Sequence, residues 1–314
     1  MSDLRASILG RRRRGLRHKS RSTENGYRRL LSEQWPSAAL ATRDAYESSV
    51  NELVAEGVDV APPLALRLAS FACERDLPEQ VASIRSFLIH AGTPADLTIV
   101  SDGSHSAWSR DLLEALHPCV SVVDWRSISR QDLPRTLWDY AEANWRGRKL
   151  LVMVSLVDER RVLWADADVL FFPCARELRE VVGPLEAHPR YLRDCEDGAF
   201  LDPEMLASRG EAAGSVNAGF VFLPRPIEWS SAVRRLEERL RSGRTTFTAQ
   251  TVVHLALHAA DARPFEPSRY VMAVDDRELA DDAHVGPETV MRHYVMPVRH
   301  KFWTTLARSS AVAR

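Results

Sequence analysis

The sequence has few long hydrophobic stretches, few cysteines and few lysines. Its longest nearly unbroken apolar run, residues 150–157, has eight residues, whereas a transmembrane helix needs roughly 20. The first residues also lack the apolar core of a secretory signal, so we expect neither kind of segment. The four cysteines contain no Cys-x-x-Cys pair, which excludes the common zinc and thioredoxin spacings. Four free thiols predict a reducing, cytoplasmic setting.

The net charge of −1 is unevenly distributed along the chain. Residues 1–30 hold ten Arg or Lys and two Asp or Glu, a composition that predicts a basic, disordered tail. Two interpretations of this tail stay open: a solvated segment without a role, and peripheral contact with an anionic membrane surface. Because the basic charge does not continue into the rest of the chain, we expect no nucleic-acid partner.

Strands and helices are predicted to alternate along most of the chain. Residues 31–63 predict a helical N-terminal extension, 64–305 a single domain and 306–314 a C-terminal tail. Within the domain, the apolar patterns predict strands at 64–72, 97–100, 120–125 and 162–165, with helices at 78–91, 106–116 and 136–157. This order predicts an α/β fold with a mostly parallel central sheet and helices on both faces. Ligands of such sheets bind at the carboxyl ends of the strands.

The clearest chemical signal is a pair of aspartates, Asp166 and Asp168, that follows a predicted buried strand and has apolar residues on both sides. Residues i and i+2 of an extended backbone project to one face, so both carboxylates are predicted to point together. Two close carboxylates repel each other, and a divalent cation relieves that repulsion. Oxygen ligands suit Mg²⁺ or Mn²⁺, which bind carboxylates together with substrate phosphates. We therefore predict a Mn²⁺ or Mg²⁺ site here, with a solvated strand end as the alternative.

The aspartate pair resembles the DxD motif of GT-A-type glycosyltransferases, especially the family-eight, glycogenin-like enzymes that use nucleotide-diphosphate sugars. Further motifs follow in that family's order. Lys149 lies seventeen residues before Asp166, Asn217-Ala218-Gly219 opens a later strand, and residues 293–303 resemble the family's His…Lys-Pro-Trp segment. The resemblance implies the GT-A fold, a catalytic site around Asp166, Asp168 and Lys149, with Lys149 at the donor sugar, and His293 as a third metal ligand.

The same resemblance implies several substrate-binding residues. Asn217 offers an amide to sugar hydroxyls, with Ala218 beside it, and Gly219 permits close approach of the backbone to the sugar. The family's diphosphate-binding lysine matches Arg299 by its spacing from His293 and Lys301 by its spacing from Trp303, so both stay candidates. Gln250 matches one half of the family's acid-Gln pair, whose acid is replaced here by Ala249.

Two residues at predicted strand ends are candidates for nucleotide binding, and each has a structural alternative. Phe71 can stack on a base or belong to the core. Asp102 can contact the nucleotide or shape the Ser-Asp-Gly turn.

Together these residues predict an enzyme: a metal-dependent glycosyltransferase, of the hexosyltransferase kind, that acts in glycan biosynthesis. The expected partners are a nucleotide-diphosphate sugar donor and an unidentified glycan, lipid or protein acceptor. The resemblance further implies retention of configuration at the transferred sugar. Two alternatives stay open. One is a haloacid-dehalogenase-type phosphatase, whose DxD also follows an apolar strand. The other is an inactive sugar-nucleotide-binding protein, which Ala249 favours.

Overall fold

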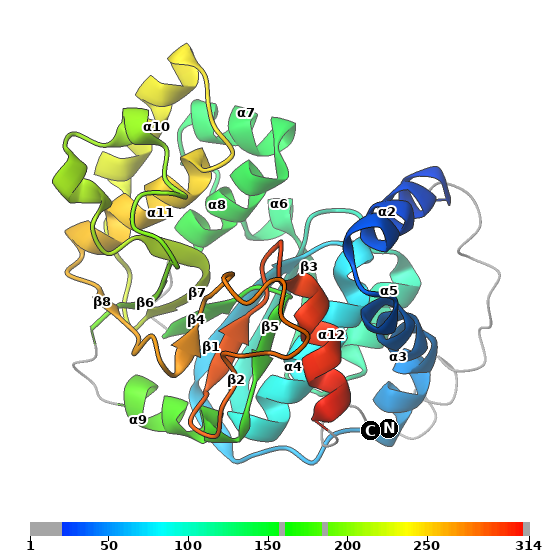
Figure 1. The fold of residues 1–314 in the computed structure, drawn as a ribbon. Coiled ribbons are helices and arrows are strands. Elements are labelled where there is room, and N and C mark those ends of the chain that lie inside the picture. The colour runs from blue at the N-terminus through cyan, green and yellow to red at the C-terminus, as the bar shows by residue number, and fades with distance from the viewer. Residues whose placement is uncertain (1–20, 157–160, 184–187, 310–314) are drawn as a thin grey trace.

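Seven strands form the main sheet, which runs through the centre of the molecule (Figure 1). This computed structural model describes residues 21–156, 161–183 and 188–309. In spatial order the strands are β3 (Val120–Asp124), β2 (Thr93–Ser101), β1 (Pro63–Ala72), β4 (Val162–Ala165), β7 (Val216–Leu223), β6 (Arg190–Arg193) and β8 (Arg263–Pro264). The first four of these are parallel to their neighbours. β7 is antiparallel to both β4 and β6, and β6 is parallel to β8. The predicted α/β class with a mostly parallel sheet is confirmed.

A second, three-stranded sheet lies beside the first and joins distant parts of the chain. Its strands are β5 (Val169–Phe171), β10 (Met291–His293) and β9 (Tyr270–Val271). β5 follows β4 after a short turn and pairs antiparallel with β10, so that Val169 lies opposite His293. This pairing brings the end of the chain to the predicted aspartate pair.

Helices cover both faces of the main sheet, as predicted (Figure 1). Alternate residues of each strand enter different cores: Leu68 of β1 belongs to one cluster, and Ala69 to the other. The helices packed on the Leu68 side are α2 (Arg21–Gln34), α3 (Ser37–Glu56), α4 (Leu77–His90), α5 (Ala107–Glu114), α9 (Leu178–Val182) and α12 (Arg299–Arg308). Those on the Ala69 side are α6 (Trp125–Ile128), α7 (Arg135–Ala143), α8 (Trp145–Ser155), α10 (Ser230–Ser242) and α11 (Thr248–Ala259).

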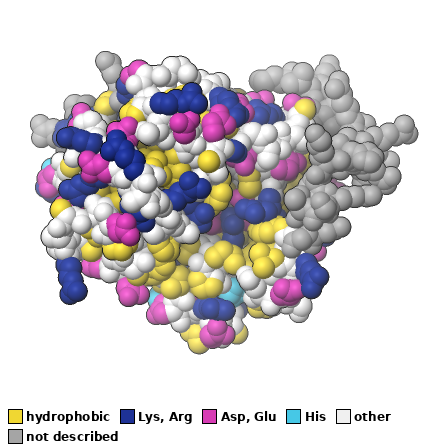
Figure 2. Space-filling model, turned by 90° about the horizontal axis from the view of Figure 1, so that it is seen from above, with side chains coloured by type: hydrophobic (Ala, Val, Ile, Leu, Met, Phe, Trp, Pro, Cys, Tyr) yellow, Lys and Arg dark blue, Asp and Glu magenta, His cyan; other side chains and the backbone are white. Residues whose placement is uncertain are grey.

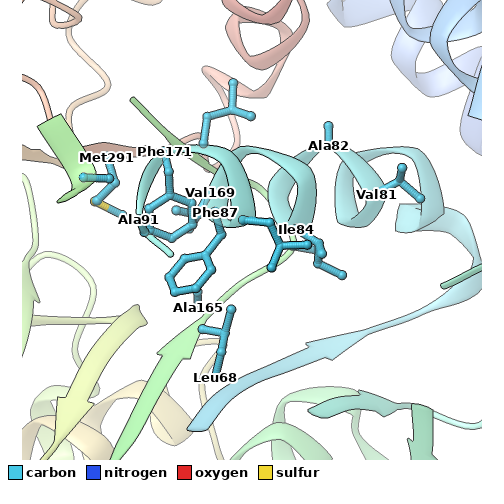
Figure 3. Packing of buried hydrophobic residues seen from close by; sticks show 14 of the residues in the cluster. Leu68, Val81, Ala82, Ile84, Phe87, Ala91, Ala165, Val169, Phe171 and Met291 are labelled. Atoms are coloured by element: carbon cyan, nitrogen blue, oxygen red, sulfur yellow. The ribbon is translucent and has the colours of Figure 1, made fainter. Parts of the chain in front are cut away.

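Helix α4 shows how the first of these cores is built. Its Phe87 side chain is fully buried and points toward Leu68 and Ala165 of the sheet (Figure 3). The same ring meets Phe171 of β5 edge-on, with ring centroids 5.0 Å apart. This helix therefore holds β5 in place next to the end of β4.

Two sequence predictions of local structure are wrong. The helix predicted at 136–157 is two helices, because Asn144 leaves the helical conformation and caps α8 by accepting a hydrogen bond from the Arg146 backbone N–H at 2.8 Å. The disorder predicted for residues 1–30 does not extend to α2, which begins at Arg21. Leu31, in the last turn of α2, and Trp35, directly after the helix, are 1% and 5% exposed, and this burial anchors the extension. Residues 1–20 and 310–314 of the predicted tails lie outside the described residues.

Candidate active site

A cavity of about 1270 Å³ opens at the edge of the sheet where β1, β2 and β4 end. Ligands of α/β sheets bind at this edge. The face of the molecule seen in Figure 2 gathers Lys and Arg side chains among hydrophobic ones near its centre. Eleven of the predicted site residues line the cavity: Phe71, Asp102, Lys149, Asp166, Asp168, Asn217, Ala218, Gly219, Gln250, His293 and Arg299.

The two aspartates converge by a route that differs from the prediction. Asp166 follows β4 and Asp168 lies in a turn that leads into β5, so the backbone between them is not extended. The turn is fixed at both ends: the Asp166 N–H donates to the Gly219 carbonyl at 2.8 Å, and the Tyr294 N–H donates to the Asp168 carbonyl at 2.9 Å. The two carboxylates still lie close together, because β7 and β10 hold the turn from both sides.

His293 completes this group from the last strand. Its Nε2 lies 3.1 Å from Asp168 Oδ1 and 3.8 Å from Asp166 Oδ2. Asn217 Oδ1 accepts the Gly219 backbone N–H at 2.9 Å and lies 2.9 Å from His293 Nδ1. Since that oxygen is an acceptor, Nδ1 must carry the hydrogen of this contact. Nε2 is then the ring atom that faces the two carboxylates.

These three side chains fit a divalent cation. One ligand atom from each of Asp166, Asp168 and His293 lies within 4.8 Å of the others. A neutral imidazole with its hydrogen on Nδ1 would place the Nε2 lone pair against carboxylate lone pairs, an arrangement that a shared cation stabilises. Two carboxylates and one imidazole are ligands that Mn²⁺ and Mg²⁺ accept. The residues of the chain therefore fit the predicted metal.

Two basic side chains balance the carboxylates. Lys149 Nζ lies 2.5 Å from Asp166 Oδ2, and Arg299 Nη2 lies 3.4 Å from Asp168 Oδ2. Burial alone would raise the pKa of Asp168. The nearby Arg299 and His293 side chains outweigh that effect and hold the pKa of this carboxyl well below its usual range. The group thus stays ionised, the form that binds a cation.

The structure shows which of the two diphosphate-binding candidates, Arg299 and Lys301, lines the cavity; the sequence could not distinguish them. Lys301 is 1% exposed, and its Nζ donates to the backbone carbonyls of Leu279 at 2.8 Å and Asp281 at 2.5 Å. This lysine stabilises the loop that contains residues 279–281. Arg299 alone of the two lines the cavity, so the substrate-binding role predicted for Lys301 has no support in the structure.

Asp194 is a pocket residue that the sequence did not reveal. It follows β6, is 5% exposed, and accepts a hydrogen bond from Gln250 Nε2 at 2.9 Å. Burial is the main cause of its raised pKa. The antiparallel pairing of β6 with β7 places it beside Asn217, whose Nδ2 is 3.5 Å away. In the sequence it lies in a mostly charged run, residues 193–197, that matches no motif.

Phe71 and Asp102, the two residues predicted to bind the nucleotide, each have the structural role given as the alternative and also line the cavity. Phe71 is 9% exposed and belongs to the core cluster on the Ala69 side while one part of it lines the cavity. Asp102 Oδ1 accepts the backbone N–H of Ser104 at 2.9 Å, as a turn residue does, and also lines the cavity.

Solved structures with the same arrangement of elements are glycosyltransferases. The galactosyltransferase LgtC, solved with donor and acceptor sugar analogues, is 14% identical over 78% of this chain and 96% of its own, with a TM-score of 0.51. The bifunctional glycosyltransferase WbbM is 14% identical over 82% and 50%, with a TM-score of 0.51. Apo GlyE of Streptococcus pneumoniae TIGR4 is 14% identical over 79% and 62%, with a TM-score of 0.50. This chain has the GT-A fold.

The GT-A fold confirms the resemblance seen in the sequence at the level of fold, while membership of family eight stays a prediction. No protein-family model matches the chain. No curated protein matches it by sequence either.

Three other findings bear on the predicted setting and on the alternatives. The helices of the described residues are all too short or too polar to cross a membrane. All four cysteines are free. In the GT-A sheet the aspartate pair follows β4 and not the first strand, so the phosphatase alternative gains no support.

Proposed function

We propose that this protein is a metal-dependent glycosyltransferase that moves a sugar from a nucleotide-diphosphate sugar to an acceptor hydroxyl. The observation that carries the proposal is the convergence of Asp166, Asp168 and His293 within 4.8 Å, inside a cavity at the carboxyl ends of the strands. LgtC was solved in complex with donor and acceptor sugar analogues, which supports substrates of this kind.

Mn²⁺ or Mg²⁺ held by these three residues would neutralise the charge that develops on the diphosphate as the glycosidic bond breaks. Asn217 orients His293 by fixing which ring nitrogen carries hydrogen. Arg299 adds positive charge at Asp168, where its guanidinium can also bind a phosphate through two hydrogen bonds.

The remaining polar groups are proposed to position the sugar. Lys149 reaches the cavity from α8 and contacts Asp166, which supports the proposal that it binds the donor sugar close to the diphosphate. Asp194 and Gln250 are joined by a hydrogen bond and offer acceptors and donors to sugar hydroxyls. Asp194 thus supplies an acidic group close to Gln250, although Ala249 lacks one. This weakens the case for an inactive binding protein.

The further details of the proposal rest on the family-eight resemblance and on composition. Retention of configuration at the transferred sugar follows from the resemblance. A cytoplasmic setting follows from the four free thiols.

The experiment measures thermal unfolding of the protein with UDP, GDP, ADP and dTDP and their sugar derivatives, each with and without Mn²⁺. A ligand that binds only the folded state raises the Tm. We expect one nucleotide to raise the Tm in a Mn²⁺-dependent way and its sugar derivative to be turned over. Asp168→Asn keeps the shape of the side chain but removes the charge, and should abolish both effects. Asp132→Asn, at an exposed position, is the matched control.

A Mn²⁺-independent response, or no response to any nucleotide, would contradict the proposal. Loss of the response in Asp132→Asn as well would show that the effect of Asp168→Asn is not specific to the site.

A further inference from the structure

The N-terminal extension as the structure shows it, residues 21–62 with α2 and α3, contributes to the wall of the active-site cavity. Tyr27 and Arg28 of α2 and Arg43, Glu47 and Val50 of α3 line the same cavity as the aspartate pair. These residues precede β1, the first strand of the GT-A sheet. The cavity is therefore not formed by the GT-A elements alone.

The extension is firmly attached to the domain. Arg43 is 4% exposed and donates to Glu79 Oε1 of α4 at 2.9 Å and to the Arg75 carbonyl at 3.0 Å. Arg28 of α2 lies 3.0 Å from Asp44 and 3.2 Å from Glu47 of α3. These contacts fix α2 and α3 relative to the end of β1.

The Tyr27 ring and the Arg75 guanidinium group, both flat, lie against each other at the end of β1. Arg75 lies in the short helical turn Glu74–Asp76, directly after β1, and its Cζ is 4.5 Å from the centroid of the Tyr27 ring. The Arg75 side chain is about half exposed (53%), and Tyr27 is partly buried. Asp102 and Ser104 line the cavity from the neighbouring end of β2. The pair therefore borders the part of the cavity that lies over the ends of β1 and β2.

Flat aromatic and guanidinium groups are the usual stacking surfaces for nucleobases, because every base has a π-face. The metal-binding group lies after β4, and Arg299 joins the two regions, since its Nη2 is 3.4 Å from Asp168 and 3.5 Å from Asp76. A diphosphate bound at Arg299 and the metal would thus leave its nucleoside on the side of Arg75.

We propose that Tyr27 of the N-terminal extension, together with Arg75, forms the surface on which the nucleobase of the donor stacks. This inference rests on the proposed function and deepens it: the extension is a part of the donor site, and it helps to set nucleotide affinity. Removal of the stacking ring should weaken binding of a nucleoside diphosphate, but not of a diphosphate without a base.

The test uses the full chain and isothermal titration with Mn²⁺ present. The probes are the nucleoside diphosphate that binds the wild type most tightly and inorganic pyrophosphate, which lacks a base. We expect Tyr27→Ala and Arg75→Ala each to raise the Kd for the nucleoside diphosphate about tenfold, the size of effect expected for one stacked base. Tyr27→Phe should bind like the wild type, and the Kd for pyrophosphate should stay unchanged in all three variants.

Arg29→Ala, two residues further along α2 and with its side chain 82% exposed, is the control and should bind both probes normally. If Tyr27→Ala fails to fold, Arg75→Ala carries the test, because its side chain is half exposed. Unchanged nucleotide binding, or an equal loss for nucleotide and pyrophosphate, would overturn the inference and leave the proposed function standing. Failure of the wild type to bind any nucleoside diphosphate would instead overturn the proposed function.

Discussion

The ring of His293 occupies the space that a side chain at position 219 would need. A Cβ added to Gly219 would lie 2.0 Å from His293 Cε1 and 2.5 Å from Nδ1. The sequence predicted that this glycine lets the backbone approach a sugar. The structure shows that it admits a candidate metal ligand.

Gly219→Ala should therefore displace the imidazole from the carboxylates. Loss of an oriented ligand typically costs about 10–100-fold in metal affinity, and we expect a loss of this size for Mn²⁺, measured by isothermal titration. Gly286→Ala is the control, since nothing lies within 4 Å of a Cβ built there and its backbone is unstrained. Equal Mn²⁺ affinity in Gly219→Ala and the wild type would show that His293 does not bind the metal.

Arg299 and Lys301 should differ in what their removal affects. Arg299→Gln removes a cation that faces the cavity, so we expect the Kd for the bound nucleoside diphosphate to rise about tenfold or more. Lys301→Met removes a buried ammonium group that donates to two backbone carbonyls, so the free energy of unfolding should fall by about 1–3 kcal/mol. Nucleotide titration and urea unfolding of both variants check this. A nucleotide-binding defect in folded Lys301→Met would argue against the assignment.

Asp194 should matter for sugar transfer more than for nucleotide binding. It contacts Gln250 and Asn217, on the side of the cavity proposed for the sugar. We expect Asp194→Asn to leave the Kd for the nucleoside diphosphate near the wild-type value and to lower kcat for transfer by about tenfold or more. Glu204→Gln, an exposed acid at 64% side-chain exposure, is the control. Loss of nucleotide binding in Asp194→Asn would place this residue at the nucleotide instead.

The buried ion pair between Asp276 and Arg292 of β10 predicts how stability depends on pH. Asp276 is 2% exposed, and its Oδ1 accepts a hydrogen bond from Arg292 Nη2 at 2.8 Å. Burial by itself would raise the pKa of Asp276, but Arg292 and the nearby Lys301 outweigh it and lower the pKa to about 2. In the unfolded chain the pKa of an aspartate is roughly 3.9. The ionised group therefore contributes stability that is fully present above about pH 4 and is lost as the pH falls through about 2.

The difference in unfolding free energy between wild type and Asp276→Asn should thus be large at about pH 6 and clearly smaller at about pH 2.5. Urea unfolding at several pH values measures it. Asp59→Asn, at an exposed position, provides the baseline. A difference that stays constant down to about pH 2.5 would contradict the lowered pKa.

The first four strands and the aspartate pair were predictable because their signals are local. β4 was predicted with its observed bounds, Val162–Ala165, since a short apolar run ends abruptly at Asp166. The break between α7 and α8 was not predictable from the pattern, because apolar residues recur at helical spacing on both sides of Asn144. The break itself lies at Asn144, which is extended and caps α8. The two helices then meet very closely at Gly147, where a Cβ would lie 2.5 Å from the Tyr140 carbonyl oxygen.

Contacts between distant segments account for the rest of the site. Arg299 and Lys301 lie two apart on one helix, about 200° around its axis, so only one of them can face the cavity. The sequence does not show which. Asp194 and Tyr27 were missed because neither lies in a motif, and each reaches the cavity through packing of its own element on the domain.

Because β5 pairs with β10, the candidate site stays incomplete until the last part of the chain has been synthesised. His293 is 125 residues beyond Asp168, and Arg299 lies later still. A nascent chain that has emerged through β7 already holds both carboxylates and Lys149, yet it lacks the imidazole of the candidate cation site. If the proposed function holds, cation affinity should appear only when β10 docks, and metal binding would then report completion of the fold and not formation of the main sheet.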